Sequence, residues 1–133
     1  MISHVHVGVD DFERALAFYD AVLPTLGLVR RFSDPGRGWA GWQLPDVARP
    51  LFLVGRPHDG RPAAPGNGQM VALLAPDRAA VDRCHAAALA AGGRDEGAPG
   101  PRPDYHADYY GAYFRDPEGN KLCICCHQPE ATP

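Results

Sequence analysis

The chain has 133 residues, of which 45% are hydrophobic, so it is long enough to bury the core of one domain. It carries 13 Lys and Arg against 16 Asp and Glu, and its formal net charge of −3 excludes the basic surface that nucleic-acid binding requires. No apolar run approaches the roughly 18 residues of a membrane helix, and the N-terminus does not resemble a signal peptide. We therefore expect a cytoplasmic protein with reduced cysteines and with neither a nucleic-acid nor a membrane partner.

The first half of the chain predicts the order β-α-β-β-β. Residues 2–9 alternate apolar and polar side chains, which is typical of a strand. Apolar residues then recur at three- and four-residue spacing over 12–26, which predicts a helix capped by Asp10 or Asp11 and ended by Gly27. Three more strands are expected, at residues 28–32, 39–44 and 51–54.

The same order returns after a linker rich in Gly and Pro at roughly residues 55–68. A strand is expected at 69–74, a helix from Pro76-Asp77 through Ala91, and a short strand after Gly93. The last element is a hairpin over 109–127, whose two strands flank the turn Asp-Pro-Glu-Gly-Asn.

The two halves keep a constant offset, which indicates an internal duplication. From His4 to the helix stop Gly27 is the same distance in sequence as from Gln69 to Gly92. The chain is therefore expected to be a single domain, residues 1–133, built from one module over about 1–57 and a second over about 67–128.

Two motifs resemble the vicinal oxygen chelate superfamily, which includes glyoxalases, bleomycin-resistance proteins and extradiol dioxygenases. They are HVHVGVDDFERALAFYDAVLPTLGL near the start and DPEGNKL near the end, and the chain is similar to small single-domain bacterial members. The resemblance implies an α+β fold in which two βαβββ modules form a curved mixed sheet around a cup-shaped site. It also implies a small-molecule ligand and a homodimer.

The resemblance also implies a divalent metal ion, bound by a His on the first strand, a His or Glu that opens the second module and a Glu on the last strand. These positions carry His4, Gln69 and Cys123, and only His4 matches in kind. The soft thiol favours zinc if Cys123 is a ligand; otherwise no cofactor is expected, and the cysteines are small buried apolar residues.

Several side chains are candidates for catalysis or substrate binding. Arg102 is expected to pair with a substrate carboxylate, and His106 to act as an acid or base beside the catalytic candidates His4 and Cys123.

Tyr109 and Tyr110 are both candidates for substrate binding. Because neighbours on a strand face opposite ways, we expect one of the two to lie in the core or in an interface. The same alternation separates Trp39 from Trp42. The remaining candidates for substrate binding are Trp42 and His6, whereas His58 and His127 are assigned no role and His85 is expected at the surface.

Three functions compete at this point. The first is a glyoxalase-like lyase or isomerase acting on a small oxygen-rich substrate through a degenerate metal site. The second is a metal-free protein that sequesters a small molecule, as bleomycin-resistance proteins do. The third is thiol chemistry at Cys123 beside His4 or His6.

Overall fold

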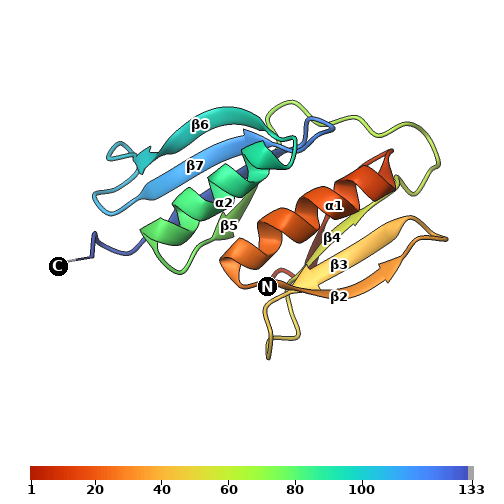
Figure 1. The fold of residues 1–133 in the computed structure, drawn as a ribbon, viewed down its shortest axis with the longest axis horizontal. Helices are drawn as coiled ribbons and strands as arrows, with labels where there is room; N and C mark the ends of the chain where they lie inside the picture. The colour runs from red at the N-terminus through yellow and green to blue at the C-terminus, as the bar shows by residue number, and fades with distance from the viewer. Residues whose placement is uncertain (132–133) are drawn as a thin grey trace.

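The computed structural model describes residues 1–131, which form two modules lying side by side (Figure 1). The first module consists of β1 (His4–Gly8), α1 (Phe12–Val22), the short 3-10 helix η1 (Leu23–Leu26), β2 (Val29–Asp34), β3 (Trp39–Gln43) and β4 (Leu51–Gly55). The second consists of β5 (Val71–Leu74), α2 (Arg78–Ala90), β6 (Arg94–Pro101), β7 (Tyr110–Arg115) and β8 (Lys121–Cys126).

Each module contains one four-stranded mixed sheet, and the two sheets have equivalent topologies. Their strand orders are β1-β4-β3-β2 and β5-β8-β7-β6, with only the first pair of each sheet parallel. Each βαβββ module thus returns its last strand beside its first. The helical region of each module ends near a glycine in the left-handed conformation. Gly27 follows η1 with a φ of 83°, and Gly92 lies two residues after α2 with a φ of 102°. The α+β fold and the duplication predicted from the sequence are confirmed.

Both helices begin at an aspartate whose side chain accepts a backbone N–H of the first turn. Asp11 accepts from Arg14 at 3.1 Å, and Asp77 accepts from Ala80 at 2.7 Å. Asp11, rather than Asp10, is therefore the N-cap of α1.

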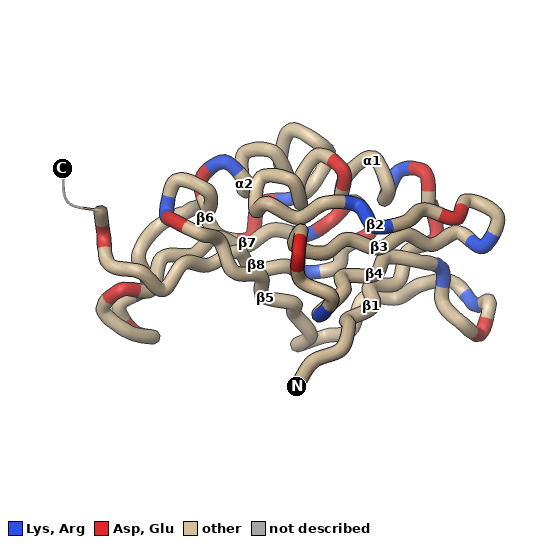
Figure 2. The backbone as a smooth tube through the Cα atoms, turned by 90° about the horizontal axis from the view of Figure 1, so that it is seen from below, with Lys and Arg blue, Asp and Glu red and all other residues tan. Residues whose placement is uncertain are grey.

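The helices cover the same side of the two sheets (Figures 1 and 2). Alternate residues of β1, β3, β4, β5, β7 and β8 face the helices and form one continuous core with them. The largest buried side chain is that of Trp42, which is 0% exposed and donates its indole N–H to Asp20 at 3.2 Å. Because Trp42 lies in the core, the prediction that it contacts substrate is wrong.

The turn between β7 and β8 attaches the second module to the first. Asp116, only 3% exposed, accepts the hydroxyl of Tyr19 from α1 at 2.7 Å. Glu118 accepts the backbone N–H groups of Asp10 and Asp11 at 2.6 and 2.8 Å, and Asn120 donates to the carbonyl of Gly8 at 2.9 Å. Because these contacts join residues about a hundred positions apart, the predicted turn also fixes how the two modules meet.

Charges of both signs are scattered over the backbone trace (Figure 2). Within residues 1–131, no helix combines the length and the apolar character that a membrane crossing requires.

Candidate functional site

The face of each sheet that points away from the helices is the candidate site. On β1, Val5 and Val7 pack into the core, so His4 and His6 project from the other face. On β8, Cys123 is 0% exposed yet lies outside the core cluster, which places it on this second face too. Three hollows follow this open face, and the linker between β4 and β5 borders all of them.

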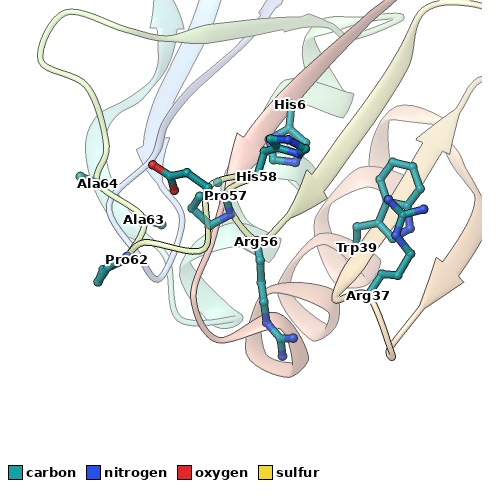
Figure 3. A pocket seen from close by; sticks show the side chains of 11 residues that line it. His6, Arg37, Trp39, Arg56, Pro57, His58, Pro62, Ala63 and Ala64 are labelled. Atoms are coloured by element: carbon teal, nitrogen blue, oxygen red, sulfur yellow. The ribbon is translucent and has the colours of Figure 1, made fainter.

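The largest of these three hollows belongs to the first module and has a volume of about 620 Å³ (Figure 3). Trp39 forms part of its wall and is held in place by the edge of Phe32, with ring centroids 4.8 Å apart. The guanidinium of Arg37 lies 4.8 Å from the centre of the Trp39 ring. The other side chains with polar groups around the hollow are those of His6, Arg56, His58 and Asp59.

Trp39, and not Trp42, therefore lines the hollow. The expectation that the two indoles face opposite ways holds, but the choice between them was wrong. His6 was predicted to line the site, and it borders both this hollow and the next one. His58, to which no role was assigned, also lines the hollow.

Gln69 connects the other two hollows. It lines the small central hollow together with His6 and Asn120, and it also lines a hollow of about 570 Å³ in the second module. Three tyrosines and two cations line that hollow: Tyr105, Tyr109, Tyr113, Arg115 and Lys121. The three hollows thus form a furrow that runs across both modules from Trp39 to Tyr105, and we call this the open-face furrow.

A cluster of thiols and aromatic side chains lies beside the second-module end of the furrow. The Tyr109 hydroxyl is 3.3 Å from the Cys123 sulfur and 3.1 Å from the hydroxyl of Tyr113. The Cys125 sulfur is 3.7 Å from Nε2 of His127. Residues 123, 125 and 127 therefore share a face, as alternate residues along a strand do.

Titration in this cluster reflects hydrogen bonds between neighbouring groups. A hydrogen bond from Cys125, helped by Tyr109 and Tyr113, lowers the pKa of Cys123 to about 6 against the opposing effect of burial. The pKa of Cys125 is raised, first by its hydrogen bond to Cys123 and then by burial. In the first hollow, burial and the nearby His4 lower the pKa of His6.

His106 joins the cluster through His127. Its Nε2 is 2.8 Å from Nδ1 of His127, and the two rings are stacked. Sequence reasoning missed His127, although its alternation with Cys123 and Cys125 was a usable signal.

Arg102 and Tyr110 do not point freely into the furrow. The Arg102 guanidinium donates to the carbonyls of Ala98 and Gly100 at 2.7 and 2.9 Å. The Tyr110 hydroxyl donates to Asp82 of α2 at 2.7 Å, so this side chain faces the helix and its predicted substrate contact is wrong. The expected surface position of His85 is also wrong, because this ring is 7% exposed and lies 3.0 Å from Asp95.

The three predicted metal ligands do not fit a metal ion as they stand in one chain. His4 is exposed and bonds Ser3 at 3.0 Å, the Gln69 amide is exposed, and Cys123 is enclosed next to Tyr109. Within residues 1–131, no group of three or more His, Cys, Asp or Glu side chains is arranged to hold a metal. No catalytic step through a metal follows from these residues.

Paired βαβββ modules with an open furrow on the face away from the helices define a glyoxalase-type fold. The family model of the Glyoxalase/Bleomycin resistance protein/Dioxygenase superfamily matches residues 1–124, and the chain belongs to this superfamily. Among curated proteins, no sequence matches the chain significantly.

Solved structures extend the comparison. A glyoxalase/bleomycin resistance protein from Albidiferax ferrireducens T118 is 38% identical, with a TM-score of 0.84 over 95% of this chain and 98% of its own. Two more distant structures share the fold. A glyoxalase-related enzyme from Fulvimarina pelagi is 19% identical, with a TM-score of 0.71 over 95% of this chain and 87% of its own. A lactoylglutathione lyase from Agrobacterium tumefaciens is 24% identical, with a TM-score of 0.65 over 95% and 92%.

Proposed function

We propose that this protein binds a small planar molecule carrying a negative charge, without a metal ion, in the Trp39 end of the open-face furrow. The observation that carries the proposal is the pairing of an aromatic wall with cations around a hollow of about 620 Å³. That volume lies within the roughly 300–1,000 Å³ that small-molecule sites occupy. The function is then that of a binding or sequestering protein rather than a metal-dependent lyase.

The ligand class follows from the side chains at the hollow. Trp39 offers a flat apolar surface, and Arg37 stacked on it leaves its charge at the rim. Arg56 adds a second guanidinium, and Asp59 is the single acid among the described residues that line this hollow. Guanidinium groups pair with carboxylates through two parallel hydrogen bonds. An aromatic carboxylate could therefore stack on Trp39 and pair its charge with an arginine at the rim.

We further propose that the furrow is completed in a homodimer. Apolar side chains on and beside the open face are unusually exposed for a single chain, among them Leu74 at 69% and Met70 at 44%. A second copy that covers this face would bury them and enclose the ligand. Analytical ultracentrifugation tests the proposed dimer. We expect the unmodified chain to sediment as a dimer and Leu74→Lys to weaken the association.

Calorimetric titration of the full chain in excess EDTA tests the binding proposal. The matched probes are 2-naphthoate and 2-naphthamide, which share a ring system and differ in charge. We expect 2-naphthoate to bind at least about tenfold more tightly, a difference of about 1.4 kcal/mol, and Arg56→Gln to remove most of that preference. Equal affinities would contradict the charge assignment, and failure of both probes to bind would contradict the proposed site.

A further inference from the structure

We propose that Asp10 is a positioning residue for the hollow beside Trp39, because its side chain fixes the one wall of that hollow that belongs to neither sheet. This wall is the first part of the linker between β4 and β5, residues 56–64, and we call it the strap. Asp10 lines a neighbouring recess but not the hollow itself, so it acts on a ligand only through the strap. The inference rests on the proposed binding function and adds to it a residue outside the site.

The strap supplies a large share of the hollow. More than half of the residues that line the hollow belong to the strap, among them Pro57 and Ala63. Pro62, Ala63 and Ala64 lie across the hollow from Trp39 (Figure 3). A ligand stacked on the Trp39 ring therefore has the strap on its other side.

Few contacts hold the strap in place. None of its residues is buried, and Pro57 and Pro62 have no N–H group to donate. The bond from the Gly60 N–H to the Pro57 carbonyl, at 3.1 Å, closes a turn within the strap and does not attach it to the rest of the protein. A segment with so few buried contacts opens locally at a low cost in free energy.

A single hydrogen bond to Asp10 attaches the strap to the first module. The Ala63 N–H donates to Oδ1 of Asp10 at 2.7 Å, and among residues 1–131 this is the only hydrogen bond that joins residues 57–64 to another segment. The strap is otherwise bonded only where it leaves β4, through the Arg56 N–H and the Gly38 carbonyl at 3.1 Å. Because the Asp10 acceptor is a carboxylate, its bond is stronger than one between neutral groups.

Asp10 has a fixed backbone, and the helix that follows does not need its side chain. Its backbone N–H donates to Oε1 of Glu118 at 2.6 Å, and Asp11 is the residue that caps α1. Replacing the Asp10 side chain therefore releases the strap without uncapping the helix. The apparent dissociation constant rises in inverse proportion to the fraction of chains whose site is formed, so a released strap weakens ligand binding.

NMR relaxation of the backbone amides in the ligand-free full chain tests whether Asp10 fixes the strap. In the unmodified chain we expect order parameters of about 0.85 over residues 58–64, and in Asp10→Ala values below about 0.6, while those of α1 stay unchanged. Asp10→Asn keeps a side-chain oxygen that can accept from Ala63, so it should restore the rigid strap. A rigid strap in Asp10→Ala, or a mobile one in both variants, would overturn the proposal.

Stopped-flow and calorimetric measurements with 2-naphthoate test what the strap does for binding. In Asp10→Ala we expect the probe to dissociate at least about threefold faster and its dissociation constant to rise by a similar factor, with Asp10→Asn close to the unmodified chain. Tyr19→Phe is the control for general destabilisation, since it weakens the contact between the modules without touching the strap, and it should leave both values unchanged.

The two measurements separate this inference from the proposed function. Unchanged binding in Asp10→Ala, or an equal loss in Tyr19→Phe, would overturn the role of Asp10 and leave the proposed site intact. Failure of 2-naphthoate to bind any of the proteins would contradict the proposed function, and the order parameters alone would then decide whether Asp10 fixes the strap.

Discussion

The hydroxyl of Tyr19 on α1 lies 2.7 Å from Oδ2 of Asp116 in the turn between β7 and β8. Both residues are buried, and they come from different modules. Burial, together with the negative charge of Asp116, raises the pKa of Tyr19 well above its usual value, so the phenol keeps its proton and donates it to the carboxylate. This contact links the two halves of the duplicated fold beneath the furrow.

Tyr19→Phe is expected to lower the free energy of unfolding by about 1.5–3 kcal/mol, because a buried carboxylate loses one donor. Urea denaturation measures this loss of unfolding free energy. Tyr110→Phe is the matched control, since its hydroxyl bonds Asp82 over the same 2.7 Å but at an exposed position, and it should cost less than about 1 kcal/mol. Equal losses in the two variants would contradict a special role for the buried pair.

Glu118→Gln is expected to destabilise the protein by about 1 kcal/mol, because its carboxylate accepts two backbone N–H groups at the start of α1. Glu13 in the first turn of the same helix is the control, since it accepts neither of these groups. Thermal unfolding of both variants measures the difference. A loss in Glu13→Gln as large as that in Glu118→Gln would show that only the helix dipole matters.

The two tryptophans are expected to respond in opposite ways to replacement by phenylalanine. Trp42→Phe removes buried volume and should cost about 1–3 kcal/mol of stability, whereas Trp39→Phe should cost little. Trp39→Phe should instead weaken 2-naphthoate binding. Urea denaturation and calorimetry check the two effects, and a Trp39→Phe variant that retains full affinity would contradict the position of the ligand.

Stability is expected to rise with pH through the titration of His6. Its pKa is lowered in the folded chain, so the unfolded chain binds more protons between the folded pKa and the ordinary value of 6.5. The stability that neutral His6 contributes is therefore fully present above the ordinary pKa of histidine and is lost as the pH falls through the lowered pKa of the folded chain. Urea denaturation at a series of pH values should show a smaller acid loss in His6→Asn, and an unchanged slope would contradict the titration.

The fold was predictable because its signals are local and occur twice. Alternation gives the strands, three- and four-residue spacing gives the helices, and glycines at positive φ end the segments that follow the helices in both modules. The turn at 116–120 was also predictable from its residues. Its long-range bonds to Tyr19 and Asp11 were not, because no local pattern records which distant groups a turn will meet.

The site was predictable only in part, because alternation separates two faces without indicating which one the helices cover. The prediction that Trp39 and Trp42 lie on opposite faces is correct, and so is the same prediction for Tyr109 and Tyr110. Packing against α1 and α2 decided which member of each pair faces the helices. His85 is different, since it lies four residues after Val81 and three before Ala88, both buried on α2. That spacing already indicated a buried position for the imidazole.

Metal dependence is the property that most directly separates a binding protein from a metal-requiring lyase in this superfamily. The decisive measurement is calorimetric titration of 2-naphthoate into the same protein after stripping with EDTA and after resupply of zinc or manganese. We predict one dissociation constant for all samples and no bound divalent ion in elemental analysis. Binding that appears only with the metal, or a full equivalent of ion held by His4, Gln69 and Cys123, would contradict the account.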